Sequence, residues 1–62
     1  MKAYFDFLDE FNDIVELNEE NIEKATEICK EWSSWYCKYI ISIEWDNENK
    51  MPHIFAEPYY PR

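Results

Sequence analysis

An apolar stripe with helical spacing is the feature that most restricts how this chain can fold. The stripe consists of Ile22, Ala25, Cys29, Trp32 and Tyr36, at steps of three and four residues, with Ile28 beside it. Such spacing places side chains on one face of an α-helix. Asn18 is a favourable N-cap, because its side-chain oxygen can accept a hydrogen bond from an otherwise unpaired backbone N–H. The sequence therefore predicts an amphipathic helix from about Glu19 to about Trp35.

A strict two-residue alternation follows this helix. Its apolar face holds Tyr39, Ile41, Ile43 and Trp45, and its other face holds Lys38, Ile40, Ser42 and Glu44. This pattern predicts a half-buried strand over residues 38–45. Residues 46–50 have the composition of a turn, and a second strand over about residues 53–57 is expected to return antiparallel. Because Pro52 and Pro58 have no amide N–H, we expect this second strand at a sheet edge.

The first 17 residues are compatible with two structures. They can form one amphipathic helix, or a hairpin with strands at residues 3–8 and 14–17 and a turn at residues 9–13. We favour the hairpin, because Tyr4, Phe5 and Phe7 suit a strand and Asn12-Asp13 suits a turn. The predicted fold is an α+β domain of two layers, in the order β-β-α-β-β, with one helix packed on an antiparallel sheet. The alternative is α-α-β-β, with residues 3–17 helical.

The length of 62 residues limits the chain to one domain, which we place at residues 1–62. A hydrophobic content of 47% argues against disorder. No apolar run approaches the roughly 18 residues of a membrane-spanning helix. Asp6, Asp9 and Glu10 interrupt the region where a secretory signal needs apolar residues. We therefore expect a cytoplasmic protein that has no contact with a membrane.

Charge is distributed unevenly along the chain. The formal net charge is -8, and residues 1–23 hold eight acidic residues and one basic residue. Direct binding to nucleic acid is disfavoured, because phosphate contacts require Lys and Arg. An acidic surface instead attracts a basic protein surface. The acidic residues that we expect to contact such a partner are Asp9, Glu10, Asp13, Glu16, Glu19, Glu20, Glu23 and Glu27.

Some of these residues recur along the predicted helix opposite its apolar stripe. This acidic row consists of Glu16, Glu20, Glu23, Glu27 and Glu31. Steps of four residues rise about 6 Å along a helix, comparable with the spacing of successive nucleic-acid phosphates. The row could therefore occupy a groove built for nucleic acid. It could equally be an ordinary solvated face, since Lys24 and Lys30 interrupt it and Glu20–Lys24 is a favourable i,i+4 pair.

Aromatic residues are too numerous for a core of this size to bury them all. The expected core aromatics are Phe5, Phe7, Trp32 and Phe55, with Tyr39 or Ile41. Exposed aromatics are expected among Trp35, Tyr36, Trp45, Tyr59 and Tyr60, of which we assign Trp35, Tyr59 and Tyr60 to partner binding. Tyr and Trp are enriched where protein interfaces concentrate binding energy. Alternatively, the C-terminal aromatics fold back and cap the core.

No residue pattern predicts catalysis, a metal or a cofactor. The adjacent carboxylates lie in predicted turns or at a helix start, where solvation prevents the raised pKa of a general acid. Cys29, Cys37 and His53 lack the fourth ligand of a structural zinc site. The two cysteines could form a disulfide or remain reduced. Residues 46–50 lack the glycine of a calcium-binding EF-hand loop.

A small, glycine-free, strongly acidic and aromatic-rich domain resembles the small inhibitors that phages and mobile elements encode. This class includes anti-CRISPR proteins and other DNA-mimicking anti-defence proteins. The resemblance implies a non-enzymatic inhibitor whose acidic surface docks on the basic nucleic-acid-binding surface of a nuclease or defence effector. The alternative is a structural or regulatory module that forms a homodimer through its aromatics or a strand edge, with its acidic residues serving solubility.

Overall fold

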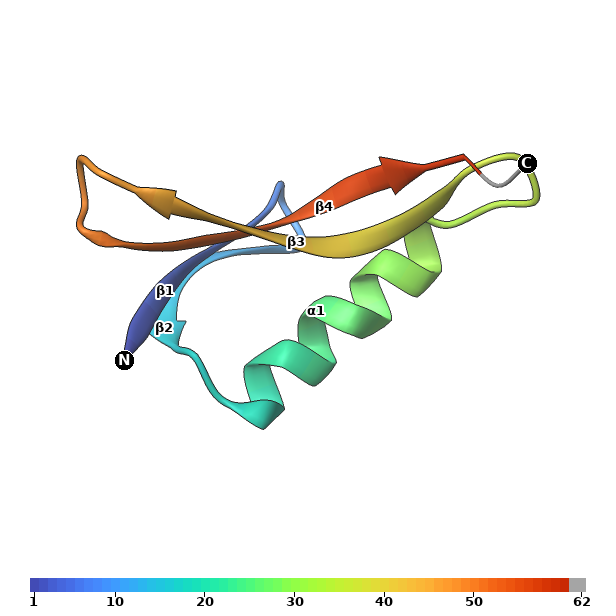
Figure 1. Ribbon diagram of the computed structural model, residues 1–62. Coiled ribbons are helices and arrows are strands. Elements are labelled where there is room, and N and C mark those ends of the chain that lie inside the picture. The colour runs from blue at the N-terminus through green and yellow to red at the C-terminus, as the bar shows by residue number, and fades with distance from the viewer. Residues whose placement is uncertain (61–62) are drawn as a thin grey trace.

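The computed structural model describes residues 1–60, which form one helix and four strands. The elements are β1 (Lys2–Phe7), β2 (Phe11–Glu16), α1 (Glu19–Trp32), β3 (Lys38–Asp46) and β4 (Met51–Tyr59). Helix α1 lies along one face of the sheet, and the opposite face is uncovered (Figure 1). The expected α+β class and β-β-α-β-β order are confirmed, and residues 3–17 belong to a hairpin rather than a helix.

The sheet is mixed, with the strand order β2-β1-β4-β3. Each hairpin is antiparallel, but β1 and β4 run parallel and pair from Tyr4↔His53 to Asp6↔Phe55. The expectation of a wholly antiparallel sheet is therefore corrected at this junction. Its cause is the path of α1, which carries the chain from β2 at one edge to β3 at the other. The two hairpins then meet through β1 and β4, which point the same way.

Strand β4 is central, which corrects the expectation that its prolines place it at an edge. The ladder with β1 covers only residues 53–55, so both Pro52 and Pro58 lie outside it. The prolines are opposite Trp45 and Tyr39 in the ladder with β3. Only alternate residues of an antiparallel strand direct their N–H groups at a given neighbour. Pro52 and Pro58 lie an even number of positions apart, so both ring nitrogens point to the same side of β4, away from β3.

The first turn is shorter than expected. It occupies residues 8–10 instead of 9–13, and Glu10 N donates to Phe7 O at 3.1 Å. Leu8 adopts a φ of 56°, which allows the chain to reverse within this length. As a result β2 begins at Phe11, which is buried, whereas the sequence analysis placed this residue in the turn.

Serine and asparagine side chains define the ends of α1. Asn18 caps the N-terminus as predicted, with its Oδ1 accepting from Asn21 N at 2.9 Å. The helix ends at Trp32, three residues earlier than expected, because Ser33 caps it. The Ser33 hydroxyl donates to Cys29 O at 2.7 Å and accepts from Tyr39 N at 2.9 Å. No helix within residues 1–60 is long and apolar enough to cross a membrane.

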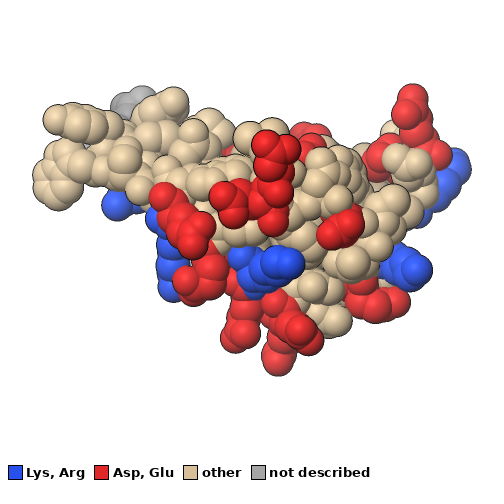
Figure 2. Space-filling view, turned by 180° about the vertical axis from the view of Figure 1, so that it is seen from behind, with Lys and Arg blue, Asp and Glu red and all other residues tan. Residues whose placement is uncertain are grey.

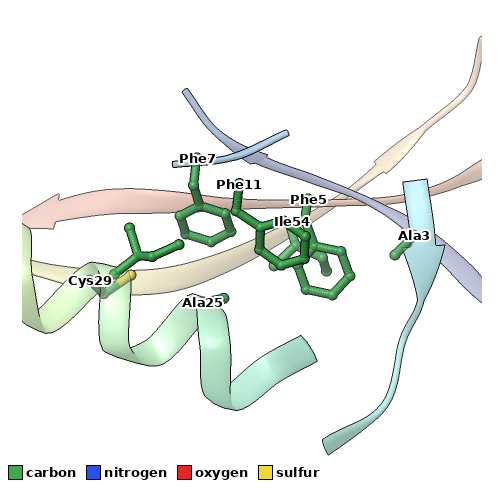
Figure 3. Close-up of a cluster of buried hydrophobic side chains, with 8 residues drawn as sticks. Ala3, Phe5, Phe7, Phe11, Ala25, Cys29 and Ile54 are labelled. Carbon is green, nitrogen blue, oxygen red and sulfur yellow. The ribbon is translucent and has the colours of Figure 1, made fainter. Parts of the chain in front are cut away.

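The core lies between α1 and the face of the sheet that it covers. Phenylalanine rings from β1 and β2 extend toward Ala25 and Cys29 of α1 (Figure 3). The buried hydrophobic residues of this core are Ala3, Phe5, Phe7, Phe11, Ala25, Ile28, Cys29 and Ile54. The rings of Phe5 and Phe11 stack with centroids 4.9 Å apart.

Among the aromatic residues expected in the core, Phe55 is the one that the structure places elsewhere. Trp32 packs against the cluster, as do Tyr39 and Ile41, and all three are partly buried. Phe55, expected in the core, lies on the uncovered face of the sheet, where it is half-buried. The reason is register: Ile54 pairs with Phe5 and faces α1, so its neighbour Phe55 must face the other way.

Candidate functional site

All eight acidic residues assigned to partner binding are exposed. We call them the acidic surface. Asp9 and Glu10 lie in the turn between β1 and β2, and Asp13 and Glu16 lie on β2. Glu19 and Glu20 form the first turn of α1, where negative charge complements the helix dipole. Glu23 and Glu27 follow on the exposed side of α1.

The fold brings these residues together only in part. Because α1 begins three residues after β2 ends, Glu16, Glu19 and Glu20 gather at that junction. Asp9 and Glu10 are at the other end of β2. Figure 2 shows carboxylates spread over the middle and lower part of the molecule, with lysines between them. The acidic surface is thus a band along β2 and α1 and not one compact cluster.

The basic residues within this band are engaged by the chain itself. Lys24 Nζ lies 4.3 Å from the centroid of the Phe11 ring, a cation–π arrangement. Lys30 Nζ lies 3.5 Å from Glu27 Oε1. Within residues 1–60, Glu16 and Glu27 are the only members of the acidic surface in an ion pair, Glu16 with the amino group of Met1. Most of the negative charge is therefore not neutralised by the fold.

Four of the five aromatics predicted to be exposed lie at the end of the molecule where α1 ends, whereas Trp45, which is also exposed, lies near the turn between β3 and β4. The side chains of Trp35 and Tyr36 are 85% and 83% exposed, in the loop between α1 and β3. Tyr59 is exposed and pairs with Lys38, which places the end of β4 beside this loop. We call Trp35, Tyr36, Tyr59 and the exposed Tyr60 the aromatic end. The aromatics do not fold back over the core.

The acidic surface and the aromatic end are thus separate. Strand β2 and the first turn of α1 lie away from the loop at residues 33–37, as the view in Figure 1 makes clear. The sequence analysis joined Trp35, Tyr59 and Tyr60 to the acidic residues in one partner-binding set. In the structure these aromatics lie at the other end of α1 from Glu16, Glu19 and Glu20.

A cluster on the uncovered face of the sheet was not predicted from the sequence. His53 Nε2 lies 3.0 Å from Asp6 Oδ2, and the His53 ring stacks on Tyr4 with centroids 5.2 Å apart. The Tyr4 hydroxyl donates to Asn12 Oδ1 at 2.9 Å, and the Phe55 ring centroid is 5.0 Å from that of His53. The signal in the sequence was the polar face of β1, where Lys2, Tyr4 and Asp6 alternate with core residues.

A groove adjoins this cluster where β4 extends beyond the last residue of β1. It has a volume of about 560 Å³ and is lined by Asp6, Leu8, Trp32, Tyr39, His53, Phe55 and Ala56. Most of its lining is apolar, and the Asp6–His53 pair lies at its margin. The groove follows from the register, because the parallel ladder stops at Phe55 whereas β4 continues to Tyr59.

Both cysteines are free thiols. Burial raises the pKa of Cys29, which lies among the core side chains. Cys37 lies beside Tyr60, and the interaction with this thiol raises the pKa of the Tyr60 phenol. Among residues 1–60, no three His, Cys, Asp or Glu side chains are grouped closely enough to hold a metal ion. His53 forms a hydrogen bond with Asp6 and is distant in the sequence from both cysteines.

Comparison with known proteins adds no relative. No protein-family model, curated protein or solved structure matches this chain.

Proposed function

We propose that this protein is a non-catalytic inhibitor that binds another protein. Its acidic surface would dock on the basic nucleic-acid-binding surface of a nuclease or defence effector and exclude the nucleic acid. The observation that carries this proposal is that the acidic surface is fully displayed and mostly without internal cationic partners. Carboxylates that form no ion pair within the chain remain available to attract a basic partner.

The geometry of α1 supports the same proposal. Glu20, Glu23 and Glu27 are all exposed on one helix, at steps of three and four residues. Their Cα atoms rise in steps of about 4.5 and 6 Å, a spacing comparable with that of successive phosphates. A rigid helix holds these carboxylates at fixed intervals, so binding does not have to order them. The interspersed Lys24 is drawn onto the Phe11 ring, which limits its interference.

The proposal is tested by competition with nucleic acid. A guide-loaded CRISPR nuclease and other basic nucleases are incubated with labelled duplex, and the chain is added in increasing amounts. We expect it to displace the duplex from at least one of these proteins, and we expect its apparent affinity to fall steeply as sodium chloride is raised. Displacement from none of them, or displacement that is indifferent to salt, contradicts the proposal.

A matched pair of variants separates the acidic surface from net charge. In the first, Glu20, Glu23 and Glu27 are all replaced by Lys. In the second, the same three replacements are made at Glu44, Glu48 and Glu57, which are exposed but lie on the second hairpin. We expect the first variant to lose at least tenfold in affinity and the second to retain most of it. Equal losses would show that only overall charge matters.

A further inference from the structure

The two edges of the sheet differ in how they are protected from pairing with another chain. Natural sheets protect a free edge with charge, proline, a bulge or a cover. The edge strand β2 is short and carries Asp13 and Glu16. The other edge is β3, nine residues long and without proline, whose charged residues Lys38, Glu44 and Asp46 lie toward its two ends. The two prolines of the second hairpin lie on β4, where they do not protect this edge.

Proline also identifies the backbone groups of β3 that point outward. Pro52 and Pro58 cannot donate to β3, so their partners Trp45 and Tyr39 occupy positions without hydrogen bonds to β4. Tyr39, Ile41, Ile43 and Trp45 share one parity, and their N–H and C=O groups therefore face the free edge. The contact of Tyr39 N with Ser33 Oγ, at 2.9 Å, agrees with this orientation. Within residues 1–60, no side chain forms such a hydrogen bond with the N–H of Ile41 or Ile43.

The side chains of β3 are unevenly covered on the face that α1 occupies. Tyr39 and Ile41, at the beginning of the strand, pack against the core. Ile43 and Trp45, toward its end, are 58% and 56% exposed. In Figure 1, this end of the second hairpin extends past α1. One half of the edge strand is thus covered by its own helix, and the other half presents two large apolar side chains to solvent.

We propose that a second copy of this chain pairs with β3 as an antiparallel strand, on a two-fold axis at Ser42. In this register Lys38 of each copy lies opposite Asp46 of the other, so that opposite charges meet at both ends. Tyr39 lies opposite Trp45, and Ile41 opposite Ile43. Directly opposite aromatic, apolar and oppositely charged pairs are the pairs that stabilise a sheet. The sequence of β3 is therefore largely complementary to itself when read in reverse, the exception being Ile40, which lies opposite Glu44.

The same register satisfies the outward backbone groups of Ile41 and Ile43 and the carbonyl of Tyr39, whose N–H is already bonded to Ser33 Oγ. Ile41 of one copy and Ile43 of the other exchange both hydrogen bonds, and Trp45 donates to the Tyr39 carbonyl. The exposed half of β3 in each copy then lies opposite the covered half of β3 in the other copy. Ile43 is placed beside Ile41 of the second copy, and Trp45 beside its Tyr39. An axis of this kind gives identical contacts on both copies, as a two-fold dimer requires. It continues the sheet from four strands in one copy into the second copy.

The mass of the wild-type protein is the first test. Light scattering during size-exclusion chromatography should give twice the chain mass of 7.7 kDa, falling to one chain on dilution. Because each copy carries a charge of -8, screening by salt should strengthen the dimer. The complex of the acidic surface with a basic partner should weaken with salt, so the outcome for the dimer is distinguishable from the outcome for the proposed inhibitor. A single-chain mass at every concentration and salt level would overturn the dimer.

Cross-linking tests the register. In a Cys37→Ser background, Ser42→Cys places two thiols directly opposite each other on the axis, within the range for a disulfide. Glu44→Cys is the matched control, on the same face of the same strand but opposite Ile40. Mild oxidation should link most of the first variant and little of the second. Equal linkage of both, or linkage of the second alone, would overturn the proposed register.

A pair of lysine substitutions tests the edge without requiring a cysteine. Ile43→Lys introduces charge into the proposed interface, whereas Ile14→Lys introduces it on β2, where Ile14 is 50% exposed. Both positions are exposed, so the monomer should fold in each case, which circular dichroism would verify. Ile43→Lys should weaken dimerisation at least tenfold and Ile14→Lys should not. A dimer that tolerates Ile43→Lys would show that β3 is not the interface.

Discussion

His53 and Asp6 form the only side-chain hydrogen bond that joins the two hairpins in residues 1–60, with Nε2 3.0 Å from Oδ2. Their strands, β4 and β1, are the parallel pair at the centre of the sheet. Both side chains are about one-third exposed on the uncovered face. The contact therefore reinforces the junction between hairpins without being part of the hydrophobic core.

Replacing Asp6 with Ala should destabilise the protein modestly. A hydrogen bond of this kind contributes roughly 0.5 to 1.5 kcal/mol, and exposure places this one near the lower value. We expect the free energy of unfolding, measured with urea, to fall by about 0.5 to 1 kcal/mol. Asp13→Ala, at an exposed position of β2, is the control and should change it less. Equal losses would mean that the Asp6–His53 contact adds nothing.

Ile54 is completely buried between α1 and the sheet, so shortening its side chain should be costly. Ile54→Val removes one methylene from a packed site, and such changes typically lower stability by about 0.5 to 1.5 kcal/mol. Ile14→Val makes the same change at a half-exposed position of β2 and should stay within about 0.5 kcal/mol of wild type. Urea unfolding of both variants measures the difference, and a larger effect at Ile14 would contradict the assigned core.

Asp46 makes the stability of the second hairpin depend on acid pH. Its carboxylate accepts from the Asn49 side chain at 2.7 Å and from the backbone N–H groups of Asn49 and Glu48. These bonds, with that from the Asn49 side chain the strongest, hold the pKa of Asp46 below its ordinary value. The stabilisation is then present above the ordinary value of about 3.9 and is lost as pH falls through the lowered value.

The measurement compares wild type with Asp46→Asn. Thermal unfolding midpoints are recorded at neutral pH and at a series of acidic values. We expect wild type to lose more stability on acidification than the variant, because the variant has no carboxylate to protonate at this position. Asp13→Asn removes an acid that makes no side-chain hydrogen bond in residues 1–60. The unfolding midpoint of this variant should depend on pH as that of wild type does. Identical acid profiles for all three proteins would exclude a contribution from Asp46.

Lys50 is one of two residues in the described chain with a positive φ, at 57°. A side chain in this left-handed conformation carries a steric cost that glycine avoids. Lys50→Gly should therefore raise the free energy of unfolding by about 0.5 kcal/mol. Asn47→Gly, in the same turn but without a positive φ, should lower it. The prediction is wrong if both substitutions destabilise equally.

Local elements were predictable where the sequence carries a periodic signal. The spacing from Ile22 to Trp32 and the Asn18 cap located α1, and the alternation from Tyr39 to Trp45 located β3. The end of α1 was harder, since it depends on a hydroxyl of Ser33 that also reaches Tyr39 N, a contact made only once β3 is in place. Phe11 was misplaced because a short turn with Leu8 in a left-handed conformation has no glycine to announce it.

Pairing between the hairpins was not predictable from the sequence. The local patterns of β1 and β4 specify which side chains face inward, but they do not specify which strands become neighbours. The cluster of Tyr4, Asp6 and His53 arises from that pairing, and so does the groove beyond Phe55. By contrast, the exposure of the acidic residues was foreseeable, because an unpaired carboxylate is costly to bury. Their separation from the aromatic end depended on the topology.

The short parallel ladder between β1 and β4 has a consequence for the rate of folding. Each hairpin closes through contacts near in sequence, whereas Tyr4↔His53 joins positions close to opposite ends of the chain. Closing so long a loop costs chain entropy before any contact repays it. The late, rate-limiting event in folding should therefore be the meeting of β1 with β4. Substitutions at Phe5 or Ile54 would then slow folding more than substitutions in either turn.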